Sequence, residues 1–159
     1  MLARIRTTRD EGEQGFTLIE LLVVMIIIGI LAAIAIPTFL NQRKNGWNSA
    51  AKTDVSNFGL AVESSAVDQG GDFTAVLLGA QGDKLAANGV LDGTKVIAGF
   101  EFTGSQNVDV YLGAAPAGSD FCLVGNNTNV SDAWWVYSKG KGGLQPTSYA
   151  DLATAESKC

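Results

Sequence analysis

One long run of apolar residues near the N-terminus divides the chain. From Leu21 to Leu40 the sequence contains no Asp, Glu, Lys or Arg, and the nearest acid is Glu20, directly before the run. A helix needs about 20 consecutive apolar residues to cross a bilayer. An ionised carboxylate at the edge of such a segment loses hydration, so Glu20 is expected to need a partner charge. The run predicts a membrane-spanning helix.

The apolar residues beyond Asn41 recur at a different, helical spacing. They are four, four, three and four residues apart, with polar residues between them: Trp47, Ala51, Val55, Phe58 and Val62. Such a stripe is typical of an amphipathic helix with one buried face. We therefore predict that the helix continues to about Ala66 with its stripe against a sheet, and that Gly70-Gly71 follows its end.

Pro37 interrupts the apolar half of this helix. A proline lacks the backbone N–H and its ring crowds the carbonyl four residues earlier, so a bend or a melted turn is expected over residues 33–37.

The rest of the chain contains short runs that are typical of strands. They are residues 96–103, 107–112, 121–124 and 133–138, with a tight turn expected at 104–106. Residues 72–94 predict at most a short helix near 74–78, and residues 145–159 an irregular tail. The fold class is therefore α+β: a long N-terminal α-helix packed on a small antiparallel sheet.

The charge and the residue types narrow the possible functions. The chain of 159 residues has a net charge of −5, which gives no electrostatic footprint for nucleic acid. Its local basic clusters, Arg43-Lys44 and Lys139/Lys141, are interpreted as solvated charge. The chain has no His, and no nucleophile has a recognisable base partner. We expect no catalytic site, no metal site and no cofactor.

Two cysteines, Cys122 and Cys159, lie in the last third of the chain. In a domain beyond a membrane helix such a pair indicates a disulfide, with two free thiols in a reducing compartment as the alternative. A loop of about 38 residues closed in this way gains roughly 4 kcal/mol of stability. The bond would hold a tail that has few large apolar side chains.

The string GFTLIE, from Gly15 to Glu20, together with the long apolar run, resembles the N-terminus of type IV prepilins and pseudopilins. The resemblance covers about the first third of the chain. It implies that a prepilin peptidase cuts between Gly15 and Phe16 and methylates the new amine of Phe16. The implied domains are a leader peptide at 1–15, a hydrophobic transmembrane and assembly helix at 16–40, and the amphipathic half-helix with an extracytoplasmic β-sheet head at 41–159.

The resemblance also implies a function as the structural subunit of a type IV pilus, used for adhesion, motility or DNA uptake. The precursor would cross the inner or cytoplasmic membrane once and then enter a homopolymer filament at the cell surface. An assembly ATPase and a platform membrane protein would be its partners. In the filament, Glu20 would pair with the Phe16 amine of a neighbour, and Pro37 would mark where the helix loosens. A disulfide-bounded C-terminal segment is also typical of this family.

Three alternatives remain open from the sequence. One is a pseudopilin of a type II secretion system, and another is a minor pilin that acts as an adhesin or DNA-uptake factor. The third is a secreted or anchored binding domain with an ordinary signal peptide. In that case Ala33-Ile34-Ala35 would be the cleavage site and the mature chain would begin at Ile36.

Overall fold

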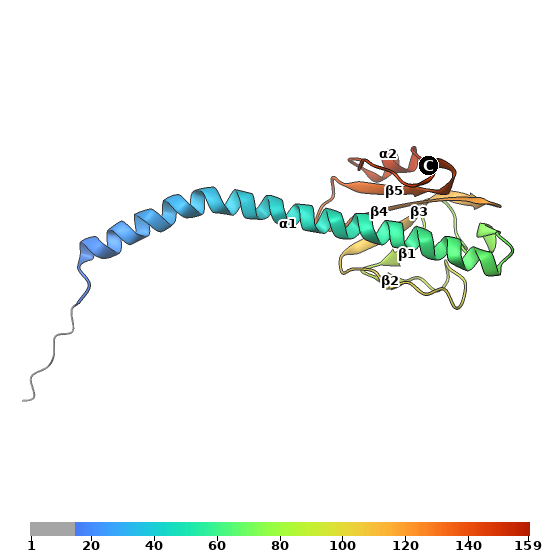
Figure 1. The fold of residues 1–159 in the computed structure, drawn as a ribbon, viewed down its shortest axis with the longest axis horizontal. Coiled ribbons are helices and arrows are strands. Elements are labelled where there is room, and N and C mark those ends of the chain that lie inside the picture. Colours follow the sequence, from blue (N-terminus) through green and yellow to red (C-terminus); the bar gives the residue numbers. More distant parts are fainter. Residues whose placement is uncertain (1–14) are drawn as a thin grey trace, which may run out of the picture. The chain divides into compact units, whose positions relative to one another are not determined.

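One helix, α1, extends from Leu18 to Asp68 and carries both hydrophobic patterns of the sequence (Figure 1). The computed structural model describes residues 15–159, so residues 1–14 of the predicted leader lie outside the described part. The chain divides into two units, the first ending at Leu40 and the second beginning at Asn41. The observed end of the helix lies close to the predicted one at Ala66, just before Gly70-Gly71.

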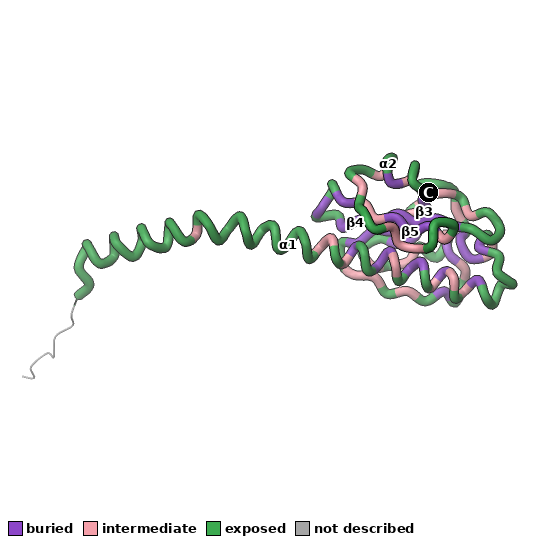
Figure 2. The backbone as a smooth tube through the Cα atoms, turned by 45° about the horizontal axis from the view of Figure 1, so that its top comes forward, coloured by how far each residue is buried: buried purple, intermediate pink, exposed green. Residues whose placement is uncertain are grey.

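Nearly every residue in the first half of α1 is exposed, and most of these residues are apolar (Figure 2). The α-helix continues through Pro37, and the Thr38 hydroxyl donates a hydrogen bond to the Ile34 carbonyl at 3.2 Å. A melted turn is therefore absent here, while a bend at Pro37 stays a prediction. The helical backbone satisfies its own polar groups, so only apolar surface is left for other molecules to cover.

The second unit is built on a six-stranded antiparallel sheet with the order β2-β1-β3-β4-β5-β6. Its strands are β1 (Lys84–Ala87), β2 (Val90–Leu91), β3 (Val108–Ala117), β4 (Asp120–Asn127), β5 (Trp134–Ser138) and β6 (Gly143–Leu144). Strands β3 to β6 follow one another as a meander. The β1–β2 hairpin adds to the free side of β3, and every pair is antiparallel. The predicted α+β class is confirmed.

The second half of α1 packs its predicted stripe against one face of this sheet. Four stripe residues are fully buried: Ala51, Val55, Phe58 and Val62. Trp47, the first member of the stripe, is only half-buried. Alternate residues of β3, Val108, Val110 and Leu112, belong to the same core. A period of 3.6 on the helix thus meets a period of two on the strands, as the sequence pattern requires.

The strand predicted over residues 96–103 is wrong. That segment is a loop with a single bridge between Val96 and Leu77. The apolar character of this segment reflects packing on the helix and not pairing in the sheet. The ring centres of Phe100 and Phe102 lie 5.2 and 4.7 Å from that of Phe58. The turn predicted at 104–106 consequently joins no pair of strands.

The edge of β3 is instead occupied by the β1–β2 hairpin, which was not predicted. Its two-residue turn is Asn88-Gly89, with φ angles of 52° and 79°. Asn-Gly with positive φ at both positions is the preferred sequence for a tight hairpin turn, so the signal was present in the sequence.

The other strand predictions are confirmed, although the strands are longer or shifted. Residues 107–112, 121–124 and 133–138 fall on β3, β4 and β5. The short helix predicted near 74–78 is a 3₁₀ helix, η1 (Phe73–Ala75), capped by Asp72. A second 3₁₀ helix, η2 (Lys139–Lys141), connects β5 to β6.

The C-terminal segment covers the face of the sheet opposite α1. It is more ordered than the irregular tail predicted, because it contains helix α2 (Leu152–Glu156) and a bridge between Tyr149 and Trp134. Ala155 is fully buried in a second, smaller core with Val124 and Val136 of the sheet. The side chain of Asp151 caps α2 and accepts a bond from the Thr154 N–H at 2.8 Å.

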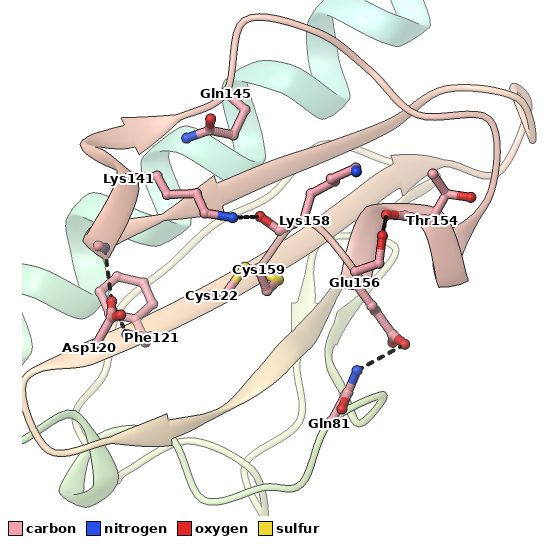
Figure 3. The surroundings of a disulfide bond; sticks show 12 residues. Gln81, Asp120, Phe121, Cys122, Lys141, Gln145, Thr154, Glu156, Lys158 and Cys159 are labelled. Carbon is pink, nitrogen blue, oxygen red and sulfur yellow. Dashed lines mark hydrogen bonds between the residues drawn. A yellow bond between two sulfur atoms is a disulfide. The ribbon is translucent and has the colours of Figure 1, made fainter.

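A disulfide joins this segment to the middle of the sheet (Figure 3). Cys122 of β4 and Cys159 have Cα atoms 5.5 Å apart, and the predicted pairing is confirmed. Figure 3 also shows Lys141 bonded to the Lys158 carbonyl, and Gln81 bonded to Glu156 at 3.3 Å. The small apolar core between the C-terminal segment and the sheet is therefore supplemented by the disulfide and by these two hydrogen bonds.

Candidate functional site

The start of helix α1 is closed by a reciprocal set of hydrogen bonds between Thr17 and Glu20. The Thr17 N–H and the Thr17 hydroxyl donate to Glu20 Oε2 at 2.8 and 2.7 Å, and the Glu20 N–H donates to the Thr17 hydroxyl at 3.3 Å. This is a capping box, in which the N-cap residue and the third helical residue satisfy each other's backbone donors. The carboxylate also lies in the first turn, at the positive end of the helix dipole.

This role of Glu20 was missed in the sequence analysis, which treated the acid only as a charge in search of a partner. The signal was the spacing of Thr17 and Glu20, because Thr-x-x-Glu before an apolar run is the sequence pattern of a capping box. Within one chain, Glu20 is thus already held in place by its own helix start. The cap leaves the charge itself unneutralised.

The two oxygens of the Glu20 carboxylate are not equivalent. Both bonds from Thr17 go to Oε2, and within residues 15–159 no hydrogen bond reaches Oε1. A carboxylate offers about four acceptor positions, so the cap leaves half of the group free for a further donor. The arrangement presents an oriented anion, fixed by the helix, with one open oxygen.

The predicted cleavage site lies immediately before this cap. Gly15 and Phe16 precede the first helical residue, and the Phe16 side chain is 89% exposed. A Cβ atom built on Gly15 would meet no atom of the described chain within 4 Å. Nothing in the described fold therefore demands a glycine at position 15, and a requirement for one would come from another molecule.

The apolar half of α1 meets the physical requirement for a membrane span. Among the described residues α1 alone is long and apolar enough, with a mean hydropathy of 3.0 over its most apolar 18 residues, none of them buried. Exposed side chains of this kind include Leu18, Ile19, Met25 and Ile34. Apolar surface of this extent on a soluble protein marks a membrane or an interaction site.

The remaining predicted site residues lie far along the chain from this cap. Pro37 lies within α1, and Cys122 and Cys159 lie in the head as a disulfide. In the part of the chain that the structure describes, no cluster of three potential metal ligands is found. The residues predicted for cleavage, methylation and charge pairing, Gly15, Phe16 and Glu20, are thus neighbours at the start of α1, where Thr17 caps the helix.

Comparisons with known proteins point to the same segment. Residues 12–36 match the family described as the prokaryotic N-terminal methylation motif. A type IV major pilin protein of Myxococcus xanthus is 48% identical over 62 residues, which are 38% of this chain and 28% of that protein. A fimbrial protein of Pseudomonas aeruginosa is 43% identical over 58 residues, 36% of this chain and 38% of that protein.

A type II secretion system core protein G, also of Pseudomonas aeruginosa, is 36% identical over 56 residues, 35% of this chain and 39% of that protein. The chain thus spans well under half the length of these relatives. No solved structure matches it significantly. The similarity lies in the methylation motif and the apolar helix, so the N-terminal segment of this chain is similar to those of type IV pilins and of a type II secretion system core protein.

Proposed function

We propose that this chain is the precursor of the structural subunit of a type IV pilus. A prepilin peptidase cuts between Gly15 and Phe16 and methylates the Phe16 amine. The apolar half of α1 then holds the subunit in the membrane as a single-pass protein until an assembly ATPase and a platform membrane protein move it into a filament. Its role is structural rather than catalytic, and adhesion, motility or DNA uptake would be functions of the finished fibre.

The observation that carries this proposal is the open oxygen of a capped Glu20 at the start of an exposed apolar helix. When such helices pack together, water is excluded and the Glu20 charge loses its hydration. The new amine of Phe16 on a neighbouring copy is a cation that can reach this oxygen, because both groups lie at the N-terminal end of the apolar helix. Pairing with Oε1 leaves the capping bonds to Oε2 intact.

The magnitudes indicate what this pair contributes. At 4 Å and an effective dielectric constant of about 20, the attraction is about 4 kcal/mol, and the loss of hydration offsets most of it. Leaving one charge buried without the other costs about 3–5 kcal/mol. The pair therefore adds little to the strength of the fibre but strongly disfavours a neighbour in the wrong register. The apolar side chains supply the driving force for association.

Two substitutions separate the role of Glu20 in capping from its role in pairing. Glu20→Gln removes the charge, whereas Thr17→Val removes the hydroxyl of the cap and keeps the carboxylate. We expect both precursors to be processed, Glu20→Gln cells to form few fibres, and Thr17→Val cells to form nearly normal ones. Sheared fibres are counted by electron microscopy, and mass spectrometry identifies the N-terminus of the subunit.

Normal fibres from Glu20→Gln cells would refute the charge pair, because glutamine can still accept the capping bonds and lacks only the charge. A mature N-terminus at Ile36 instead of Phe16 would support the secreted domain with an ordinary signal peptide. A change of Gly15 to Arg tests the junction itself: we expect untrimmed precursor, although a Cβ atom at this position meets no atom of the described chain within 4 Å.

A pseudopilin of a type II secretion system is the second candidate, because the core protein G named above shares the same N-terminal segment. The two functions differ in their product. A pilus subunit is the main component of fibres sheared from the cell surface, whereas a pseudopilin would be absent from them and its deletion would stop protein secretion.

A further inference from the structure

We propose that Arg43, Lys44 and Trp47 form a lipid-headgroup collar that binds anionic phospholipids on the far side of the membrane from the leader. The inference rests on the single-pass membrane state proposed above. It assigns a partner to the one basic segment of α1, which has no role in processing or in the Glu20 pair.

The collar residues are preorganised and free to bind. The guanidinium carbon of Arg43 lies 4.7 Å from the centre of the Trp47 ring, a cation–π contact that holds the charge over the aromatic face. Arg43 and Lys44 are exposed and Trp47 is half-buried. Within residues 15–159 neither cation forms an ion pair, and the two ion pairs observed both lie in the β-sheet part of the head.

The position of the collar along the helix matches the headgroup layer. Arg43 and Lys44 follow the last residue of the apolar run, Leu40, by three and four residues, or about 5–6 Å of helix, and Trp47 by about 10 Å. The polar layer on each side of a bilayer is about 5–7 Å thick. The two cations thus reach the depth of the lipid phosphates. The backbone of Trp47 lies just beyond the polar layer, and because helical side chains point back toward the N-terminus its indole ring lies at the outer edge of that layer. Tryptophan and long cationic side chains are preferred at this depth.

The charge distribution favours an anionic surface as the partner. Between Asn41 and Thr53 the chain has three cations, Arg43, Lys44 and Lys52, and no acid, although the protein as a whole has a net charge of −5. The next acid, Asp54, is buried and accepts a hydrogen bond from the Ser105 N–H at 2.6 Å. The segment closest to the membrane is therefore positive, and the remainder of the head is kept from the same lipids by its negative charge.

The collar would fix the depth at which a waiting subunit lies in the membrane. Each cation near an anionic surface strengthens binding to that surface about five-fold at moderate salt. The contact is lost when the subunit leaves the bilayer, so it favours storage over extraction. High salt weakens it, because the Debye length falls to about 3 Å at 1 M ionic strength.

Fluorescence quenching by spin-labelled lipids tests the collar in the full chain. The protein is reconstituted in phosphatidylcholine vesicles that contain a small fraction of either phosphatidylglycerol or phosphatidylcholine carrying a spin label close to the glycerol backbone. Subtracting the signal of Trp47→Phe isolates Trp47 from Trp134 and Trp135. We expect labelled phosphatidylglycerol to quench Trp47 several-fold more than labelled phosphatidylcholine at the same fraction, and the difference to disappear in about 1 M salt.

A matched pair of variants controls for net charge. Arg43→Gln with Lys44→Gln should abolish the preference, whereas Lys139→Gln with Lys141→Gln removes the same charge elsewhere in the head and should leave it unchanged. Equal quenching by the two lipids in a protein that resists alkaline extraction would overturn the collar alone.

Two other outcomes are also decisive. Quenching that depends on the protein-to-lipid ratio instead of the labelled headgroup would assign the collar to a second copy of the chain, and would overturn the lipid proposal. Failure of the full chain to resist alkaline extraction would refute the membrane-spanning state, and with it the proposed function.

Discussion

The contact between Gly59 of α1 and Tyr137 of β5 allows a prediction that opposes the usual effect of a helix glycine. In an exposed helix, Gly→Ala stabilises by about 1 kcal/mol because alanine loses less backbone entropy. A Cβ on Gly59, however, would lie only 2.6 Å from the Cε1 and Cζ atoms of the Tyr137 ring. Ordinary contact begins at 3.4 Å, so the ring would have to move by most of an ångström.

The ring has little freedom to move. Tyr137 is 95% buried, its ring stacks on Phe121 at 5.7 Å, and its hydroxyl donates to Glu63 Oε1 at 2.8 Å. Overpacking of this kind costs about 1–3 kcal/mol, and losing a hydrogen bond to a carboxylate costs about 1.5–3 kcal/mol. After subtraction of the gain in helix propensity, we expect Gly59→Ala to destabilise the head by about 1.5–5 kcal/mol.

Gly46 provides the matched control on the same helix. It is exposed, and a Cβ built on it meets nothing within 4 Å. Gly46→Ala should therefore stabilise by up to about 1 kcal/mol. Thermal unfolding of the full chain in detergent, followed by circular dichroism, distinguishes the two variants. For a head of this size a loss of 1 kcal/mol lowers Tm by roughly 4 °C, so the Tm of Gly59→Ala should be roughly 6–20 °C lower.

The close approach itself is tested by a double variant. Tyr137→Leu removes the ring, so adding Gly59→Ala to it should cost much less than in the wild type, with a coupling of about 0.5–3 kcal/mol. If Gly59→Ala raised Tm as Gly46→Ala does, the argument from the helix–sheet distance would be refuted.

Three further changes probe other parts of the head. Removing the disulfide by Cys122→Ala with Cys159→Ala should cost about 4 kcal/mol and make the C-terminal segment the first site of proteolysis; an unchanged Tm and cleavage pattern would contradict its role as a tether. The Asp54 carboxylate accepts a hydrogen bond from the Ser105 N–H at 2.6 Å. Asp54→Asn should therefore lower the free energy of unfolding by about 1.5–3 kcal/mol and speed amide exchange at Ser105. Unchanged exchange would show that this bond does not hold the loop. Burial, together with the hydrogen bond to a carboxylate, raises the pKa of Tyr137 to about 12 from an ordinary 10.0. The contribution of Tyr137 to folding stability is therefore complete below pH 10 and should fall by roughly 2 kcal/mol as pH rises to 12. In urea titrations at each pH, Tyr137→Phe should lose less stability over this range than the wild type, by that amount.

The sequence by itself determined the features that depend on neighbours along the chain. The apolar run, the amphipathic stripe and the string from Gly15 to Glu20 each repeat or fall within a few residues, and helix geometry turns such spacing directly into faces and caps. The capping box of Thr17 and Glu20 could also have been predicted from the spacing of these two residues. The tight turn at Asn88-Gly89 was also a local signal that went unused.

The tertiary structure decided what depends on residues far apart. The aromatic segment at 96–103 has the composition of a strand, yet its rings pack on Phe58 of the helix. The edge of β3 pairs instead with β1, whose sequence is less typical of a strand. The need for glycine at 59 arises only because Tyr137, on a strand 78 positions later, lies against that helix turn. Strand partners and close approaches depend on which segments meet after long loops close, and the pattern of a single segment does not contain that information.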